Sequence, residues 1–185
     1  MAAHVLRSVH PQYALDAGAD DLAHMVLNEL DDDLLGRVVD DDVYWEPTLE
    51  VWNCTGQLYE ATFNLRRVVQ AGGHAALGTD YHDVERHPEA NRFLSGCSLD
   101  LGMPMTEIGL MLEADMTPMQ IIVAATNNGA HVCGLDDQIG TLEAGKVADI
   151  LVVAGDPLED LQALTDVRMV VHNGVVIRNE ISATE

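Results

Sequence analysis

The sequence predicts an α/β fold in which a parallel sheet is followed by a small antiparallel piece. Up to residue 80, short β-branched or aromatic runs alternate with longer segments whose apolar residues recur at helical spacing, which is typical of parallel βα units. Beyond residue 147 the segments are all short and strand-like, and turn signals separate them. With 185 residues, 48% of them hydrophobic, the chain is long enough to bury a core.

In the first 80 residues, strands and helices are expected to follow one another in order. Asp31 to Asp33 open one of the helices, because acidic side chains favour a helix N-terminus. Gly72 and Gly73 end the next. The expected helices cover residues 11–17, 31–39 and 58–69, and the expected strands cover 21–24, 43–48 and 74–79.

The second half begins with a long loop over residues 81–103, where no period is visible, and long ordered loops are often functional. A helix is expected over 104–114, and Thr117-Pro118-Met119-Gln120 has the capping pattern of a second one running towards Gly134. Short strands follow over 148–153, 169–172 and 175–178, and Asn173-Gly174 predicts a hairpin between the last two. The strand after Asp149 is expected to be buried.

Charge and composition exclude several classes of protein. The net charge is −22, from 31 acidic and 9 basic residues, so nucleic-acid binding is not expected. No apolar run is long enough to cross a membrane and no signal peptide is seen, so a cytoplasmic protein is predicted. The acidic surface suits either a halophilic cytoplasm or an ordinary acidic protein. Three cysteines without a CxxC pair are expected to be free thiols: Cys54, Cys97 and Cys133.

Three polar side chains stand at the ends of strand-like segments. Asp80 follows the apolar run 74–79, and His4 and His24 end two segments upstream. Carboxylate and imidazole are ordinary ligands of divalent metals, and chemistry collects at the carboxyl ends of parallel strands. The simpler alternatives are a turn aspartate, a frayed terminal histidine and a hydrogen-bonded histidine at a strand end. In the loop that follows Asp80, four side chains are candidates either for substrate contact or for an ordinary loop surface: Tyr81, His82, His87 and Arg92.

Several segments together resemble the C-terminal half of metal-dependent amidohydrolases, in the imidazolonepropionase-like and Xaa-Pro dipeptidase-like subgroup. These segments are Leu77–Asp80, Thr117–Gln120 with Ala124–Asn127, Ile139–Ile150 and Gly155–Leu158. Upstream, His4, Ala17-Gly18 and Ala23-His24 look like the fifth and sixth strands of that family, Pro47-Thr48 like its seventh, and Asn64–Arg67 like the helix before its eighth.

The resemblance implies strands five to eight of a TIM-like barrel in residues 1–138 and the C-terminal part of a small β-sandwich in residues 139–185. It also implies one or two divalent metals at the barrel mouth, with zinc as the first choice and manganese, iron or nickel as alternatives. The metal ligands would be His4, His24 and Asp80. Asp80 would also accept a proton from the attacking water.

The chain departs from the family pattern in one respect. The family's first strand carries a His-x-His pair, and its fourth strand carries a lysine or glutamate that can bridge two metals. This sequence contains no His-x-His pair, and its only lysine, Lys146, lies in the sandwich motif. We therefore expect a fragment that is inactive alone, from a parent that hydrolyses C–N bonds of small amide or dipeptide-like substrates. It would pair with the missing N-terminal half or with another copy. The alternative is a non-catalytic half-barrel that serves as an interaction or assembly module.

Overall fold

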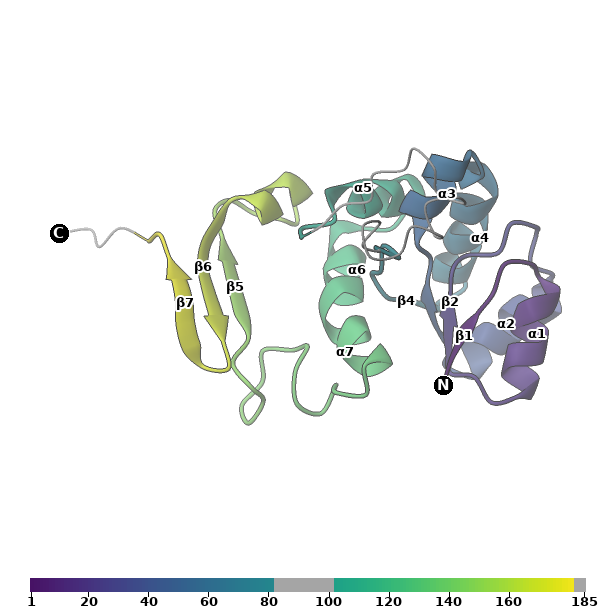
Figure 1. Ribbon diagram of the computed structural model, residues 1–185, viewed down its shortest axis with the longest axis horizontal. Coiled ribbons are helices and arrows are strands. Elements are labelled where there is room, and N and C mark those ends of the chain that lie inside the picture. The colour runs from purple at the N-terminus through teal and green to yellow at the C-terminus, as the bar shows by residue number, and fades with distance from the viewer. Residues whose placement is uncertain (82–101, 182–185) are drawn as a thin grey trace, which may run out of the picture. The chain divides into compact units, whose positions relative to one another are not determined.

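The computed structural model describes residues 1–81 and 102–181 and divides the chain into two compact units, Met1–Thr117 and Pro118–Glu185 (Figure 1). Each unit contains one sheet. The expected division into a barrel part ending at residue 138 and a sandwich part from residue 139 stays a prediction.

The first unit is built on a four-stranded parallel sheet with the order β1-β2-β3-β4, which confirms the parallel sheet predicted from the sequence. His4 pairs with Ala23, and Ala23 pairs with Glu46, so the first three strands end at one level. The last strand is shorter than predicted, because it stops at Ala75. The strands are β1 (Ala2–His4), β2 (Asp21–Ala23), β3 (Tyr44–Glu46) and β4 (His74–Ala75).

Alternate positions of this sheet differ sharply in character, as expected for a two-residue period. One row across the strands is apolar, and its members Leu22 and Trp45 are fully buried. The neighbouring row carries Asp21, Tyr44 and His74, of which the last two stack with ring centroids 4.7 Å apart. The sheet therefore has an apolar row that builds the core and a polar row beside it.

Helices connect the strands, and most of them lie where the sequence predicts. Asp31 caps α2 by accepting a hydrogen bond from the Leu34 amide at 2.7 Å, and the acidic first turn is present as expected. Leu65 and Val68 are fully buried on α4, which confirms its apolar stripe. The helices of this unit are α1 (Val9–Asp16), α2 (Asp32–Asp40), α3 (Leu49–Thr55), α4 (Leu58–Gln70) and α5 (Met105–Glu113).

Helix α3 was not predicted. Val51, Trp52 and Thr55 have modest helix propensity, so nothing local indicates a helix here. Gly56, at a φ of 77°, ends the helix in the left-handed conformation that glycine adopts readily. The first turn of α3 is held instead by a side chain from a distant helix.

The side chain of Asn64, on α4, fixes the loop that follows β2. It is fully buried, and its amide nitrogen donates to the carbonyl oxygens of Val26 and Asn28 at 3.0 and 3.1 Å. Its oxygen accepts from the Leu30 amide at 3.2 Å. One amide side chain therefore satisfies three backbone groups of a loop that begins at His24.

The second unit begins with a helix whose middle is π-helical. It runs through α6 (Pro118–Val123), η2 (Ala124–Asn128) and α7 (Gly129–Val132). Its start at Pro118 and its extent agree with the prediction, whereas the π segment was not predicted. Gly140 packs against this helix at a φ of 93°, and a Cβ there would lie 2.6 Å from the Cβ of Ala130. The position therefore has no room for a side chain.

Three antiparallel strands complete the second unit, as predicted. The hairpin turn has positive φ at Asn173 (50°) and Gly174 (75°), which the predicted two-residue turn requires. Asp149 fixes this turn, because its carboxylate accepts from the Asn173 amide at 2.7 Å and contacts Nδ1 of His172 at 3.0 Å. The strands are β5 (Ile150–Val153), β6 (Val167–His172) and β7 (Val175–Asn179), in the order β5-β6-β7, with the short 3₁₀ helix η3 (Leu161–Thr165) before β6.

Two expectations are wrong. The strand after Asp149, β5, was expected to be buried, but Leu151 is 46% exposed and the other residues of β5 are only partly buried. Cys54 was expected to be a free thiol and is disulfide-bonded, whereas Cys133 is free and exposed. Within residues 1–81 and 102–181, no helix is both long and apolar enough to cross a bilayer.

We predict that Asn64→Ala lowers the free energy of unfolding by about 2–4 kcal/mol, because it leaves buried backbone groups of the loop after β2 without partners. Urea denaturation measures this. The matched control is Asn53→Ala at an exposed position of α3, which should change stability by less than about 0.5 kcal/mol. Equal effects of the two substitutions would contradict the role given to Asn64.

Candidate functional site

Two of the three predicted ligands lie side by side. His4 is the last residue of β1, and His24 directly follows β2. Their ring centroids are 4.3 Å apart, with an angle of 69° between the ring planes. The level ends of the paired strands therefore bring together two imidazoles that are twenty residues apart in sequence.

The backbone of His24 is held on both sides. Its amide donates to the Glu46 carbonyl at 2.9 Å, and its carbonyl accepts from the indole nitrogen of Trp45 at 2.7 Å. The residue is only 7% exposed. These contacts fix where the imidazole leaves the strand end.

The ring of His24 is oriented by Thr48. Nδ1 lies 2.7 Å from the Thr48 hydroxyl oxygen, and the ring of Trp52 lies edge-on with its centroid 6.1 Å away. A contact at Nδ1 leaves Nε2 as the nitrogen that can bind a metal.

Asp80 lies five residues beyond the end of β4. Burial lowers the pKa of His24, the Asp80 carboxylate raises it, and His4 lowers it further. Burial prevails, so His24 favours the neutral form that metal binding requires. Asp80 is thus electrostatically linked to His24. Within residues 1–81 and 102–181, however, no group of three or more histidine, cysteine or acidic side chains is arranged to hold a metal ion. The structure pairs the histidines and does not complete a three-ligand cluster.

Backbone strain is concentrated at this site. In the described part of the chain, six non-glycine residues have positive φ, and three of them are His24 (69°), Thr48 (48°) and Asp80 (56°). Each such conformation costs about 1–3 kcal/mol and persists only where the surroundings impose it. Strain of this kind often accompanies functional sites.

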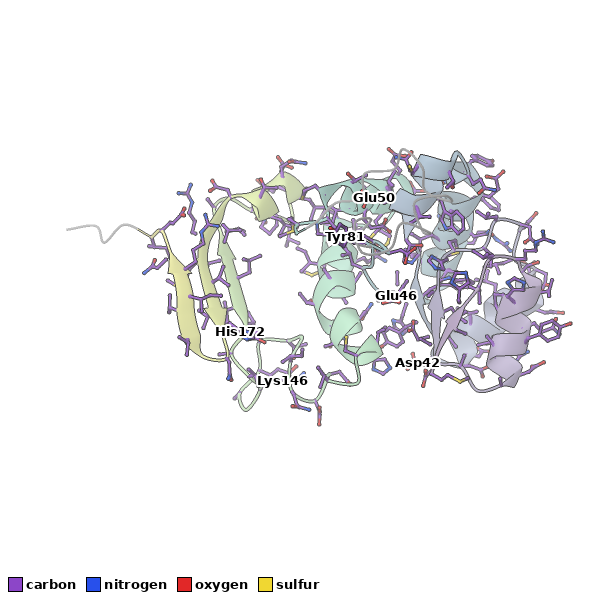
Figure 2. All side chains as sticks on the ribbon, in the orientation of Figure 1. Asp42, Glu46, Glu50, Tyr81, Lys146 and His172 are labelled. Atoms are coloured by element: carbon purple, nitrogen blue, oxygen red, sulfur yellow. The ribbon has the colours of Figure 1, made fainter. Side chains whose placement is uncertain are left out.

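Two carboxyl groups on β2 and β3 have pKa values above their ordinary range. Burial, and then the charge of Asp20, raises the pKa of Asp21, which the N-terminal ammonium and the Leu22 amide oppose. Burial, and then the charge of Asp21, raises the pKa of Glu46, a β3 residue in register with Ala23 (Figure 2). The surroundings of the histidine pair are therefore acidic and partly desolvated.

Glu107, on α5, is a residue that the sequence reasoning missed. It is fully buried, and its two carboxylate oxygens accept from the amides of Leu49 and Glu50 at 2.9 and 2.7 Å. Burial raises its pKa to about 7 although both amides lower it, and the charge of Glu50 raises it a little further. The available signal was an acidic residue beside Ile108 and Met111, on the apolar face of a predicted helix.

Of the four candidates for substrate contact, the structure describes only Tyr81. Tyr81 is 46% exposed, and its amide donates to the Thr79 hydroxyl at 3.2 Å (Figure 2). The other three candidates lie outside the described residues: His82, His87 and Arg92.

A cavity of about 600 Å³ lies within the first unit, and neither His4 nor His24 is among its lining residues. Trp52 belongs to its wall and also contacts His24. The cavity is mostly apolar with a few polar groups, a composition typical of small-molecule sites. Its lining residues are Leu6, Arg7, Val9, Leu27, Asn28, Trp52 and Gln57.

Comparison with known proteins decides the family. Residues 43–177 match the model of the amidohydrolase family. The chain belongs to the amidohydrolase family. Proteins of this family generally bind divalent metals.

The curated relatives that the chain matches are imidazolonepropionases. The chain is 34% identical over 88 residues to the imidazolonepropionase of Rubrobacter xylanophilus, covering 48% of this chain and 18% of that protein. It is 30% identical over 118 residues to the imidazolonepropionase of Geobacillus thermodenitrificans, covering 62% and 25%. The matched segments therefore span about a quarter or less of these relatives.

Solved structures show the same fold, and the neighbours are TIM-barrel proteins. A Xaa-Pro dipeptidase with methionine bound in its active site superposes with a TM-score of 0.78 at 22% identity, covering 96% of this chain and 44% of that one. The ochratoxinase of A. niger gives a TM-score of 0.79 at 21% identity, covering 98% and 42%. The chain thus spans less than half of either structure.

We predict a pH-dependent stability that originates from Glu107. A carboxyl whose pKa is raised on folding, here from 4.5 to about 7, contributes stability below the unfolded pKa and loses it as pH rises through the folded pKa. The stability of the wild type relative to Glu107→Gln should therefore fall by up to about 3 kcal/mol between about pH 4.5 and pH 8. Urea denaturation across this range measures it, with Glu113→Gln, exposed on the same helix, as control. A difference that does not vary with pH would contradict the assignment.

Proposed function

We propose that this chain carries part of the metal site of a hydrolase acting on C–N bonds of non-peptide or dipeptide-like amides. His4 and His24 would be metal ligands, and Asp80 both a ligand and a proton acceptor. The observation that carries the proposal is the histidine pair at two adjacent strand ends, with ring centroids 4.3 Å apart. Membership of the amidohydrolase family supports it.

The donor chemistry fits a divalent metal. Two imidazoles and a carboxylate suit zinc first, and also manganese, iron or nickel. When bound, such an ion would lower the pKa of a water molecule towards neutrality. His24 is kept neutral by burial and is oriented by Thr48. Asp80 would take up a proton at a carboxylate oxygen.

The substrate would be a small molecule. Names of relatives and neighbours such as imidazolonepropionase and Xaa-Pro dipeptidase support an amide or dipeptide-like substrate. The apolar cavity whose wall includes Trp52, a residue that also contacts His24, would offer a place for the side chain of that substrate. We infer that the reaction takes place in the cytoplasm and that the chain is the C-terminal half of a barrel. We expect it to be inactive alone, because the sequence holds no His-x-His pair.

One observation favours a second candidate, a non-catalytic module that acts through assembly. Three consecutive apolar residues of β7 are 52–65% exposed: Val175, Val176 and Ile177. Exposed apolar strands of this kind mark interaction surfaces. The same surface would serve the leading proposal if it received the missing N-terminal half or a second copy.

We predict that the full chain binds zinc and that His24→Ala and Asp80→Asn weaken this binding. Isothermal titration calorimetry and metal analysis of the purified protein measure it. Loss of a residue that supports a metal ligand lowers metal affinity roughly 10- to 100-fold, so loss of the ligand His24 should lower zinc affinity by more than that. His172→Ala, at an exposed histidine of the second unit, should bind like the wild type. If neither the wild type nor the variants hold a divalent metal, the ligand assignment fails for this chain.

The hydrolase and the non-catalytic module also predict different oligomeric states and zinc binding in solution. If the β7 face is covered in an assembly, light scattering coupled to size-exclusion chromatography should find an oligomer that Ile177→Lys shifts to monomer, because a charge on that face disfavours burial. Glu180→Lys, a charge change just past the strand, is the control. Zinc binding by the monomer would favour the hydrolase proposal, and an oligomer that binds no metal would favour the module.

A further inference from the structure

The buried carboxylate of Glu107 has no place in the chemistry described above. It lies 58 residues from Leu49 in sequence, yet both of its oxygens are bound to the first amides of α3. A fully buried carboxylate is costly to place, even with hydrogen bonds. Because its burial is costly, this carboxylate should stabilise a local conformation that the rest of the fold does not stabilise.

The N-cap residue of α3, Thr48, has an unusual conformation. Thr48 stands at the N-cap position, where a threonine normally accepts a hydrogen bond from an amide of the first turn. It makes no such bond here and adopts φ 48° and ψ 49°. This is the left-handed region that β-branched residues avoid. Its hydroxyl is directed to Nδ1 of His24 instead, at 2.7 Å.

We propose that Glu107 is a positioning residue for His24 and acts through Thr48. Glu107 takes over the capping of α3, so the Thr48 hydroxyl is free to hold the imidazole. By fixing Leu49 and Glu50 it also holds Thr48 in its left-handed conformation. The proposal rests on the proposed function only in treating His24 as a metal ligand; the contacts themselves do not depend on it.

The chemistry of the imidazole gives this arrangement its purpose. A histidine that binds a metal through Nε2 must carry its remaining proton on Nδ1, and the acceptor at Nδ1 fixes both the tautomer and the ring plane. In this chain the Thr48 oxygen, 2.7 Å from Nδ1, would be that acceptor when Nδ1 carries the proton. Without Glu107, the amide of Glu50, at the second position of the helix, would compete for that hydroxyl oxygen, and His24 would lose its partner.

The test is imidazole ¹⁵N NMR on the full-length chain without metal. The wild type should show His24 as the Nδ1–H tautomer, and Glu107→Gln, which offers only one acceptor, should give a mixture of tautomers. Thr48→Val should give the same mixture, and Thr48→Ser should restore the wild-type signal. Glu113→Gln, an identical change at an exposed position of α5, should leave His24 unchanged. Circular dichroism establishes that each variant folds.

Zinc titration supplies the second measurement. Glu107→Gln and Thr48→Val should each weaken zinc binding by about 10- to 100-fold. The double variant should be no weaker than either single variant if Glu107 acts through Thr48. Should Glu107→Gln fail to fold, Glu107→Asp, which keeps the charge but withdraws it from the amides, is expected to give the same mixture of tautomers.

The outcomes separate the two proposals. A folded Glu107 variant with wild-type His24 signals, or fully additive losses in the double variant, would overturn the positioning role. A wild type that binds no zinc would remove the metal-ligand assignment instead, while the tautomer comparison would still decide whether Glu107 positions His24.

Discussion

The register of the parallel strands is the constraint on which the rest of the site depends. His4, Ala23 and Glu46 occupy one level across β1, β2 and β3, so the residues at and just beyond these strand ends converge. A slip of one residue would reverse the facing of every side chain on a strand. It would also separate His4 from His24. The fully buried Leu22 and Trp45 fix the register, because only one alignment places both in the core.

Within this register, contacts between residues far apart in sequence fix the orientation of His24. Trp45 holds the backbone of His24, Thr48 holds its ring, and Glu107 holds the helix that follows Thr48. Left-handed backbone at His24 and Thr48 costs stability, as does the buried carboxylate of Glu107. The core of the first unit supplies that stability. If His24 binds a metal as proposed, these costs would have a functional reason, because metal binding depends on the orientation of the ligands.

The sequence predicts the repeating features well, because they depend on local periodicity. The strand–helix order, the acidic start of α2 and the Asn173-Gly174 hairpin follow from short-range rules. It also places His4 and His24 at the ends of strand-like segments, whereas their direct contact follows from the pairing of β1 with β2 in the structure. Helix α3 could not be predicted, because Glu107, from far along the chain, stabilises its first turn. For the same reason the role of Thr48 was not visible: its partner depends on tertiary structure.

The most direct test of the central claim, that the adjacent strand ends gather a histidine metal site, is zinc X-ray absorption spectroscopy on the zinc-loaded full chain. The account predicts at least two imidazole nitrogens bound to zinc at about 2.0–2.1 Å, and one fewer imidazole in His24→Ala. Zinc bound through sulfur at about 2.3 Å, as from the free thiol of Cys133, or an imidazole signal that His24→Ala leaves unchanged, would contradict it.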